Sequence, residues 1–159
     1  MQADRTDVTN ATAGASRFYP LGMGIKNIHE MVAAAKADID NISPAEAKRR
    51  VDEEGALLVD IRDVRELQKL GVPVGAHHAP RGMLEFWVSP DSPYHSDVFD
   101  DDREYIFCCG GGWRSAFAAK TMQEMGMEQV SHVETGFTGW VEDGMPVQAY
   151  DEWKAARKR

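Results

Sequence analysis

Apolar positions in this chain switch between stretches with helical spacing and short runs that are apolar almost throughout. In residues 25–39 they recur every three or four positions, which predicts an amphipathic helix. Residues 56–61 and 104–108 form nearly continuous apolar runs, typical of strands that a parallel sheet buries on both faces. Shorter strands are expected in 76–79 and 129–133, so the pattern predicts strands that alternate with helices.

Capping residues mark where several other helices begin and end. The segment Ser43-Pro44-Ala45-Glu46 combines a serine cap, an early proline and a glutamate that reaches back, which predicts a helix ending near Gly55. Asp63 is expected to cap a short helix, with Glu66 in the capping-box position and Gly71 as the stop. Helical segments are also predicted for 83–88, 115–125 and 136–141, and a surface loop for 89–102.

This alternation predicts an α/β domain with a central parallel sheet and helices on both faces. We expect a single such domain over residues 43–148. Residues 1–42 are expected to form an N-terminal extension, poorly ordered over about the first 20 residues and then helical. We expect that helix to cover an exposed face of the domain rather than to dock a partner. Residues 149–159 are expected to be a solvated tail with a locally basic end.

The composition is that of an acidic protein: 159 residues, 43% of them hydrophobic, with a formal net charge of −8 and a pI of about 5.1. The acidic balance argues against general nucleic-acid binding, and no stretch approaches the roughly 20 apolar residues of a membrane span. Residues 1–16 lack the basic start and apolar centre of a signal peptide. The two cysteines are adjacent, which implies no disulfide framework. A reducing, cytoplasmic location is therefore expected.

The strongest chemical signal is the segment that begins at Cys109. A thiol stands at the end of an apolar strand, and an alanine-rich helix follows; between and around them lie Gly110, Gly111, Gly112, Trp113, Arg114 and Ser115. Glycines let the backbone curl and point successive N–H groups inward, and the helix start adds the positive end of its dipole. A thiol in such a cradle should lose its proton easily, and the thiolate is the reactive form.

Four motifs, in this order along the chain, resemble those of rhodanese-like domains. They are Asp60-Ile61-Arg62-Asp63, the stretch from Val72 to Gly82, the loop from Cys109 to Ser115, and Thr135-Gly136-Phe137-Thr138-Gly139-Trp140 with Gly144-Met145-Pro146-Val147. The resemblance runs from about residue 43 to 147. The chain departs from the family pattern at Val74 and at Thr135, and neither residue touches the chemistry of the loop.

The resemblance implies sulfur transfer without a cofactor. Cys109 would attack the outer sulfur of thiosulfate or a similar donor, and a persulfide would remain on the enzyme. A thiol, cyanide or a protein acceptor would then take the outer sulfur, and the inward N–H groups of the loop would stabilise the negative charge. We expect neither nucleic acid nor a membrane among the partners.

Several charged residues near this loop have competing interpretations. Arg114 either helps to bind an anionic donor or pairs with a carboxylate on a neighbouring element and so holds the loop in shape. Arg62 is expected to be structural, and Asp60 to fix the loops around the pocket through backbone N–H groups. Arg81 is a candidate for recognising a donor oxyanion, and Trp113 either lines the pocket mouth or packs.

Cys108 offers an alternative nucleophile. On a strand its side chain faces away from that of Cys109, which favours a buried core thiol. However, five residues lie between Cys108 and Arg114. This is the spacing between cysteine and arginine in tyrosine phosphatases and in arsenate reductases that resemble the rhodanese fold. The glycines after Cys109 favour Cys109 instead. A third alternative is a non-catalytic module that displays this surface to a partner.

Other chemistries find little support in the sequence. The histidines have no metal-ligand spacing with one another or with the cysteines, so no metal site is predicted; they are His29, His77, His78, His95 and His132. The glycine run also lacks the lysine and the spacing of a P-loop.

Overall fold

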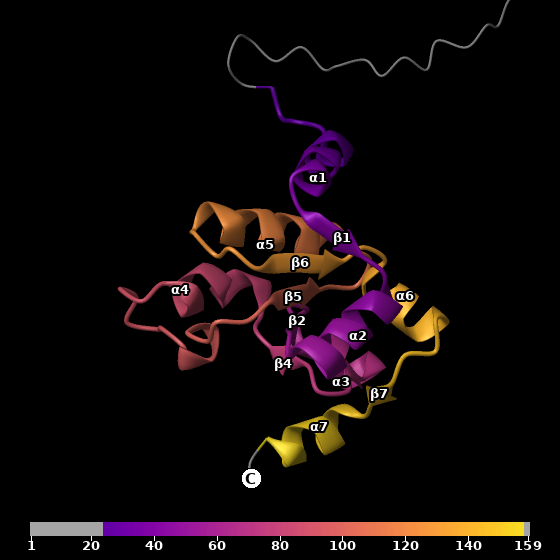
Figure 1. The fold of residues 1–159 in the computed structure, drawn as a ribbon. Coiled ribbons are helices and arrows are strands. Elements are labelled where there is room, and N and C mark those ends of the chain that lie inside the picture. The colour runs from indigo at the N-terminus through magenta and orange to yellow at the C-terminus, as the bar shows by residue number, and fades with distance from the viewer. Residues whose placement is uncertain (1–23, 158–159) are drawn as a thin grey trace, which may run out of the picture.

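The computed structural model describes residues 24–157, and its centre is a five-stranded parallel sheet (Figure 1). The strand order is β1-β6-β5-β2-β4, with β1 at Asp40–Ile42, β2 at Leu57–Asp60, β4 at His77–His78, β5 at Tyr105–Cys108 and β6 at Val130–Val133. All four pairings between neighbours are parallel, which confirms the predicted α/β fold. The prediction that the first 20 or so residues are poorly ordered lies outside the described residues.

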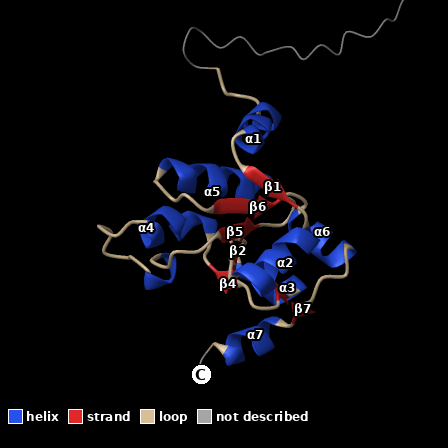
Figure 2. Cartoon of the chain, in the orientation of Figure 1, coloured by secondary structure: helices blue, strands red, loops and turns tan. Residues whose placement is uncertain are grey.

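Helices cover both faces of the sheet (Figure 2). On one face lie α1 (Ile28–Ala37), α4 (Leu84–Val88) and α5 (Trp113–Glu124), and on the other α2 (Pro44–Glu54), α3 (Val64–Leu70) and α6 (Gly136–Glu142). Because successive strand residues point to opposite faces, the central strands β2, β5 and β6 contribute to two separate cores. Phe107 and Cys109 belong to the core that includes α5, whereas Ile106 and Cys108 pack in the core that includes Trp140 of α6.

The capping residues act as their positions predict. Ser43 Oγ accepts a hydrogen bond from the Glu46 N–H at 3.1 Å, and α2 ends at Gly55 in the left-handed conformation. Asp63 and Glu66 form a complete capping box at the start of α3. Helix α5 begins at Trp113, two residues before the predicted start, because Gly112 turns the chain directly into the helix.

The N-terminal helix is present but shorter than predicted. It begins after Asn27, whose side chain accepts from the N–H groups of the first turn, and it ends at Ala37. Val32 and Ala35 are buried on its inner side, and the helix packs against α5. The expectation that this helix covers a face of the domain is confirmed.

Strand β1 departs from the predicted division of the chain. Asp40, Asn41 and Ile42 pair with Ser131, His132 and Val133, so this strand is part of the main sheet although the extension was expected to reach residue 42. This three-residue stretch is too short and too polar to show a strand pattern in the sequence. It is a strand because its backbone pairs with that of β6.

The segment expected to be a solvated tail instead contains a helix, α7 (Tyr150–Ala156). Trp153 is buried among core residues and donates from Nε1 to the Ala76 carbonyl at 2.8 Å. A small antiparallel pair, β3 (Val72–Pro73) with β7 (Val147–Gln148), leads the chain into this helix. One buried tryptophan thus fixes a segment whose remaining residues are largely polar or small.

The remaining connections contain short 3-10 turns, η1 (Arg81–Met83) and η2 (Asp97–Phe99). Apart from η2, the predicted loop over 89–102 is irregular, and α4 lies within the segment predicted to be helical. No helix in residues 24–157 has the length and apolar character needed to cross a membrane.

Candidate active site

Cys109 lies at the carboxyl edge of the sheet, directly after β5 and at the start of the loop that leads into α5. Ligands of parallel sheets collect at this edge. The residue is only 1% exposed, and it lines a pocket of about 280 Å³ together with Gly111, Trp113 and Arg114. A small reactant that entered this pocket would come next to Cys109.

Backbone N–H groups of the loop converge on the sulfur. The Gly112 N–H donates to Cys109 Sγ at 3.1 Å, and the Ser115 N–H donates to it at 3.4 Å. Both donors lie at the start of the 12-residue helix α5, whose dipole adds positive potential there. The predicted cradle is therefore formed by Gly112 and Ser115, and it can stabilise negative charge on Sγ.

The opposite side of the loop is held by the turn between β6 and α6. The Phe137 N–H donates to the Cys109 carbonyl at 2.7 Å, and the Thr138 N–H donates to the Gly110 carbonyl at 3.0 Å. A Cβ on Gly136 would lie 2.6 Å from the Gly110 oxygen, so the turn approaches the loop as closely as only glycine allows. The loop carbonyls point to α6, which leaves N–H groups free to face the sulfur.

Arg114 pairs with a carboxylate on a neighbouring element, which agrees with the structural one of its two interpretations. Its Nη1 and Nη2 donate to Glu66 Oε2 and Oε1 at 2.7 and 2.9 Å. This bidentate contact lowers the pKa of Glu66, mainly through the hydrogen bonds from Arg114. The guanidinium lines the pocket, and its charge is balanced by α3.

Asp60 and Arg62 form a fully buried ion pair on the other face of the sheet. Asp60 accepts from the Arg62 backbone N–H at 3.1 Å and from its guanidinium at 2.7 Å. Arg62 also donates to the Gly71 carbonyl at 2.9 Å and lies 3.8 Å from the centre of the Phe137 ring. The pair thus lies against α6, whose N–H groups hold the loop after Cys109. Arg62 is structural, as predicted. The carboxylate of Asp60 was expected to fix the loops around the pocket through backbone N–H groups, but the hydrogen bonds found for it are all with Arg62, so it acts on those loops through Arg62.

Of two other predicted site residues, Trp113 lines the pocket of Cys109 and Arg81 does not. Trp113 is 47% exposed and meets His29 of α1 edge-on, with ring centroids 5.1 Å apart, so the N-terminal helix reaches the mouth of the pocket. Arg81 donates to Glu85 at 2.6 Å and is not among the residues that line the pocket of Cys109. A role for Arg81 in recognising the donor stays a prediction.

Cys108 points into the core on the opposite face, as the strand pattern predicts. It is fully buried, and its Sγ donates to the Cys109 carbonyl at 3.5 Å. Burial raises its pKa well above the usual thiol value, and the nearby Asp60 carboxylate acts in the same direction. These surroundings suit an inert structural thiol.

A chain of polar side chains behind the sulfur was not predicted from the sequence. Ser115 Oγ lies 3.4 Å from Cys109 Sγ and 2.9 Å from His132 Nδ1, and His132 Nε2 lies 2.7 Å from Asn41 Oδ1. His132 and Ser115 are both fully buried. A histidine in the middle of a predicted buried strand was the available signal, but its partners come from elements far away in the sequence.

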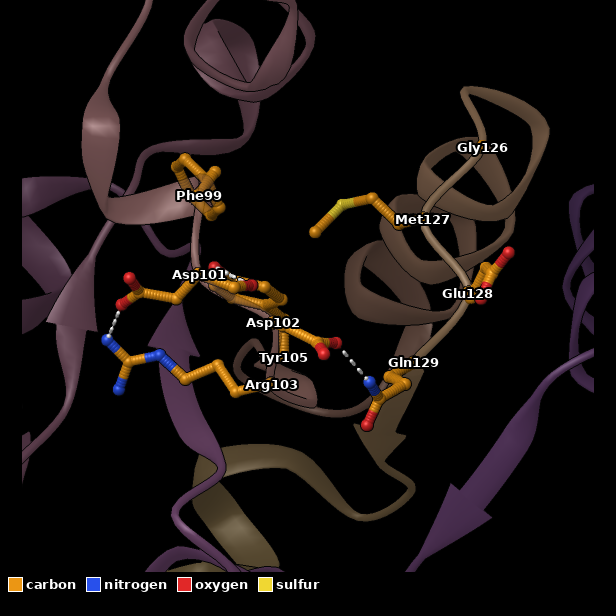
Figure 3. Close-up of a pocket in the computed structure, with 9 residues that line it drawn as sticks. All are labelled: Phe99, Asp101, Asp102, Arg103, Tyr105, Gly126, Met127, Glu128 and Gln129. Carbon is orange, nitrogen blue, oxygen red and sulfur yellow. Dashed lines mark hydrogen bonds and ion pairs between the residues drawn. The ribbon is translucent and has the colours of Figure 1, made fainter.

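A second pocket, of about 270 Å³, lies at the opposite edge of the sheet (Figure 3). Its lining comes from the segment before β5 and the segment before β6, including Asp102 and Gln129, which are hydrogen-bonded at 2.9 Å. The pocket contains neither cysteine. Within residues 24–157, no group of three or more His, Cys, Asp or Glu side chains could hold a metal ion.

Known proteins match this chain over most of its length. The sequence model of the rhodanese-like domain matches residues 43–143. The thiosulfate sulfurtransferase GlpE of Glaesserella parasuis is 31% identical over 107 residues, which are 67% of this chain and 91% of the relative. The putative sulfurtransferase YtwF of Bacillus subtilis is 29% identical over 110 residues, 69% of this chain and 97% of the relative.

Two solved structures extend the comparison to the fold. The polysulfide-sulfur transferase homodimer of Wolinella succinogenes has a TM-score of 0.58 and 30% identity, over 76% of this chain and 85% of that one. A protein of unknown function from Rhodopseudomonas palustris, described as a possible tyrosine phosphatase, has a TM-score of 0.73 and 40% identity, over 77% of this chain and 95% of that one. Both enzyme classes considered for the loop, sulfurtransferase and phosphatase, thus appear in the names of similar proteins.

Proposed function

The chain belongs to the rhodanese-like domain family, and from this premise we propose that it is a sulfurtransferase whose nucleophile is Cys109. The donor is thiosulfate, a polysulfide or a similar carrier of sulfane sulfur, the substrates named for the relatives. The acceptor is a thiol, cyanide or a protein. A cytoplasmic location stays a prediction.

One observation carries the proposal: Cys109 lines a pocket, and its Sγ accepts two backbone hydrogen bonds from the loop around it. Charge-assisted hydrogen bonds of this kind act where charge develops during the reaction. Here charge develops first on Sγ, as it loses its proton, and then on the outer sulfur of the persulfide.

The reaction has two steps. Cys109 Sγ forms a bond to the outer sulfur of the donor, and the donor's own bond to that sulfur breaks with its electron pair leaving on the departing group, which is sulfite when the donor is thiosulfate. An acceptor nucleophile then bonds to the outer sulfur, and the electron pair of the persulfide bond returns to Sγ. The four residues between Cys109 and Arg114 form a loop suited to one sulfur atom.

A phosphatase that uses Cys108 is the alternative, and the relative from Rhodopseudomonas palustris is described in those terms. Burial of Cys108 on the far face of the sheet argues against it, because a nucleophile must reach its substrate. The pairing of Arg114 with Glu66 also means that the guanidinium charge is already balanced by a carboxylate, which weakens its attraction for a phosphate.

The test compares Cys109→Ser with Cys108→Ser, two adjacent variants of the same chemistry. After the protein is mixed with thiosulfate or polysulfide, intact mass followed by peptide mapping should find one added sulfur atom on Cys109. Cys108→Ser should keep this gain and Cys109→Ser should lose it. Hydrolysis of an aryl phosphate that disappears in Cys108→Ser would establish the phosphatase instead. If no donor adds sulfur to the unmodified chain, the non-catalytic module replaces the enzyme.

A further inference from the structure

The chain of polar groups behind the sulfur has a defined direction. Asn41 Nδ2 donates to two backbone carbonyls, those of Lys36 at 2.8 Å and Ile39 at 3.0 Å. These contacts orient the amide so that Oδ1, which can only accept, faces His132 Nε2. Nε2 therefore carries the hydrogen.

This orientation continues through the serine to the sulfur. In a neutral imidazole with its hydrogen on Nε2, Nδ1 can only accept, so the Ser115 hydroxyl donates to it. That hydroxyl has one hydrogen, and it therefore offers a lone pair to Cys109. Cys109 Sγ, 3.4 Å away, is the donor of the remaining contact, so the chain runs from the thiol towards His132.

We propose that this chain of Ser115, His132 and Asn41, called the relay below, accepts the Cys109 thiol proton as Cys109 attacks the sulfur donor. The inference rests on the proposed sulfurtransferase function. It adds a place for the proton, which the two N–H donors of the loop cannot take. His132 acts through Ser115, and Asn41 fixes which nitrogen of His132 is free to accept.

The proton balance closes over the two steps. In the first, the S–H bond of Cys109 breaks, its proton passes to Ser115 Oγ, and the hydroxyl proton of Ser115 passes to His132 Nδ1. His132 becomes an imidazolium that donates to Ser115 and Asn41, while Sγ bonds to the incoming sulfur. In the second, the acceptor removes the outer sulfur, the electron pair returns to Sγ, and the proton moves back along the same path.

The surroundings of His132 keep it neutral until the sulfur site becomes negative. Its pKa is lowered to about 4, mainly by burial and also by the charge of Lys36 of α1, whereas Asp40 of β1 acts in the opposite direction. A free proton acceptor is therefore present at neutral pH. Cys109 is the titratable group that the relay meets on the side of α5, and negative charge there stabilises the imidazolium.

Alkylation of Cys109 by iodoacetamide tests the relay without any sulfur donor. Ser115→Ala keeps the backbone N–H that faces Sγ but interrupts the relay, and His132→Gln keeps a hydrogen-bonding side chain that cannot accept a proton. We expect each to slow alkylation at neutral pH by about tenfold or more and to move the pH midpoint of the reaction upward. The double variant should be no slower than the slower single variant. His95→Gln, on an exposed loop, is the matched histidine control and should behave as wild type.

Nitrogen-15 NMR of the histidine rings in the unmodified protein gives a second readout that does not depend on a buried substitution. At about pH 6 to 8, His132 should be the neutral Nε2–H form at rest, and it should become an imidazolium when one sulfur atom is loaded on Cys109. A hydrogen on Nδ1 at rest, or a ring unchanged by loading, overturns the relay.

The two proposals fail in different ways. Wild-type alkylation in both Ser115→Ala and His132→Gln overturns the relay, even if Cys109 still gains sulfur. Absence of any sulfur gain on Cys109 overturns the proposed function, whatever the alkylation profile shows.

Discussion

Replacing Gly112 with alanine tests whether the backbone shape of the loop creates the sulfur site, that is, Cys109 Sγ with the N–H groups of Gly112 and Ser115 that face it. Gly112 has φ +90°, and a Cβ there would lie 1.9 Å from the Glu134 carbonyl oxygen. The strained backbone costs about 1–3 kcal/mol, and forcing the neighbouring chain apart costs about 1–3 kcal/mol more. For a chain of this size, a loss of about 2–6 kcal/mol lowers the Tm by roughly 4–24 °C.

The same change should impair chemistry, because the Gly112 N–H is the shorter of the two hydrogen bonds to Sγ. Alanine keeps this N–H, but relief of the clash with the Glu134 carbonyl moves it away from Sγ, and loss of one such hydrogen bond lowers the rate by about 100- to 1,000-fold. The assay is thermal unfolding together with the rate at which thiosulfate adds sulfur to Cys109, measured by mass. Gly82→Ala is the matched control, since no heavy atom lies within 4 Å of its Cβ position and Gly82 is not among the residues that line the pocket of Cys109. Equal Tm values and equal loading rates for Gly112→Ala and Gly82→Ala would refute the reasoning.

Three further substitutions test contacts that support the site. Glu66→Gln should change the free energy of unfolding by less than about 1 kcal/mol at pH 7. Because Arg114 lowers the pKa of Glu66, the wild-type ion pair stabilises the fold above the pKa that Glu66 has in the unfolded chain, and this stabilisation is lost on acidification. Free energies of unfolding from urea titrations of the two proteins should therefore converge as the pH falls. Asp60→Asn leaves the Arg62 guanidinium buried without its counter-ion and should cost about 3–5 kcal/mol in urea unfolding; an unchanged midpoint would show that the pair does not brace the domain. Trp153→Ala should lower the free energy of unfolding by about 3–5 kcal/mol, and Trp153→Phe, which mainly loses one hydrogen bond, should lower it by about 1 kcal/mol. Equal losses in the two variants would mean that packing of the Trp153 ring is not what holds α7 on the domain.

The position of Cys109, the proposed nucleophile, could be predicted from the sequence because it depends on local rules. An apolar run predicts a buried strand, and the period of two then assigns Cys108 and Cys109 to opposite faces. The two cores of the structure contain one cysteine each, as this alternation requires. Capping residues such as Ser43 and Asp63 are equally local, which is why α2 and α3 begin where predicted.

Contacts between distant segments could not be predicted in the same way. Arg114 and Glu66 are 48 residues apart, and the sequence left open whether the arginine meets a donor or a carboxylate. Strand β1 is short and polar, and only its pairing with β6 makes it a strand. Because that pairing was missed, the contact between Asn41 and His132, 91 residues apart, was missed with it.

Two different parts of the chain therefore determine the two properties of the sulfur site. The match to the family covers 43–143, which includes Cys109, its loop, Ser115 and His132, so the cradle of N–H donors lies entirely within it. Asn41 lies just before that match, on β1, where pairing with β6 brings it to His132. Charge stabilisation at the sulfur can therefore be common to the family, while the direction of the hydrogen bonds behind it is set by a residue outside the matched segment. Strand β1 is then more than one edge of the sheet: in the proposed relay it supplies Asn41, the group that determines which nitrogen of His132 can accept a proton.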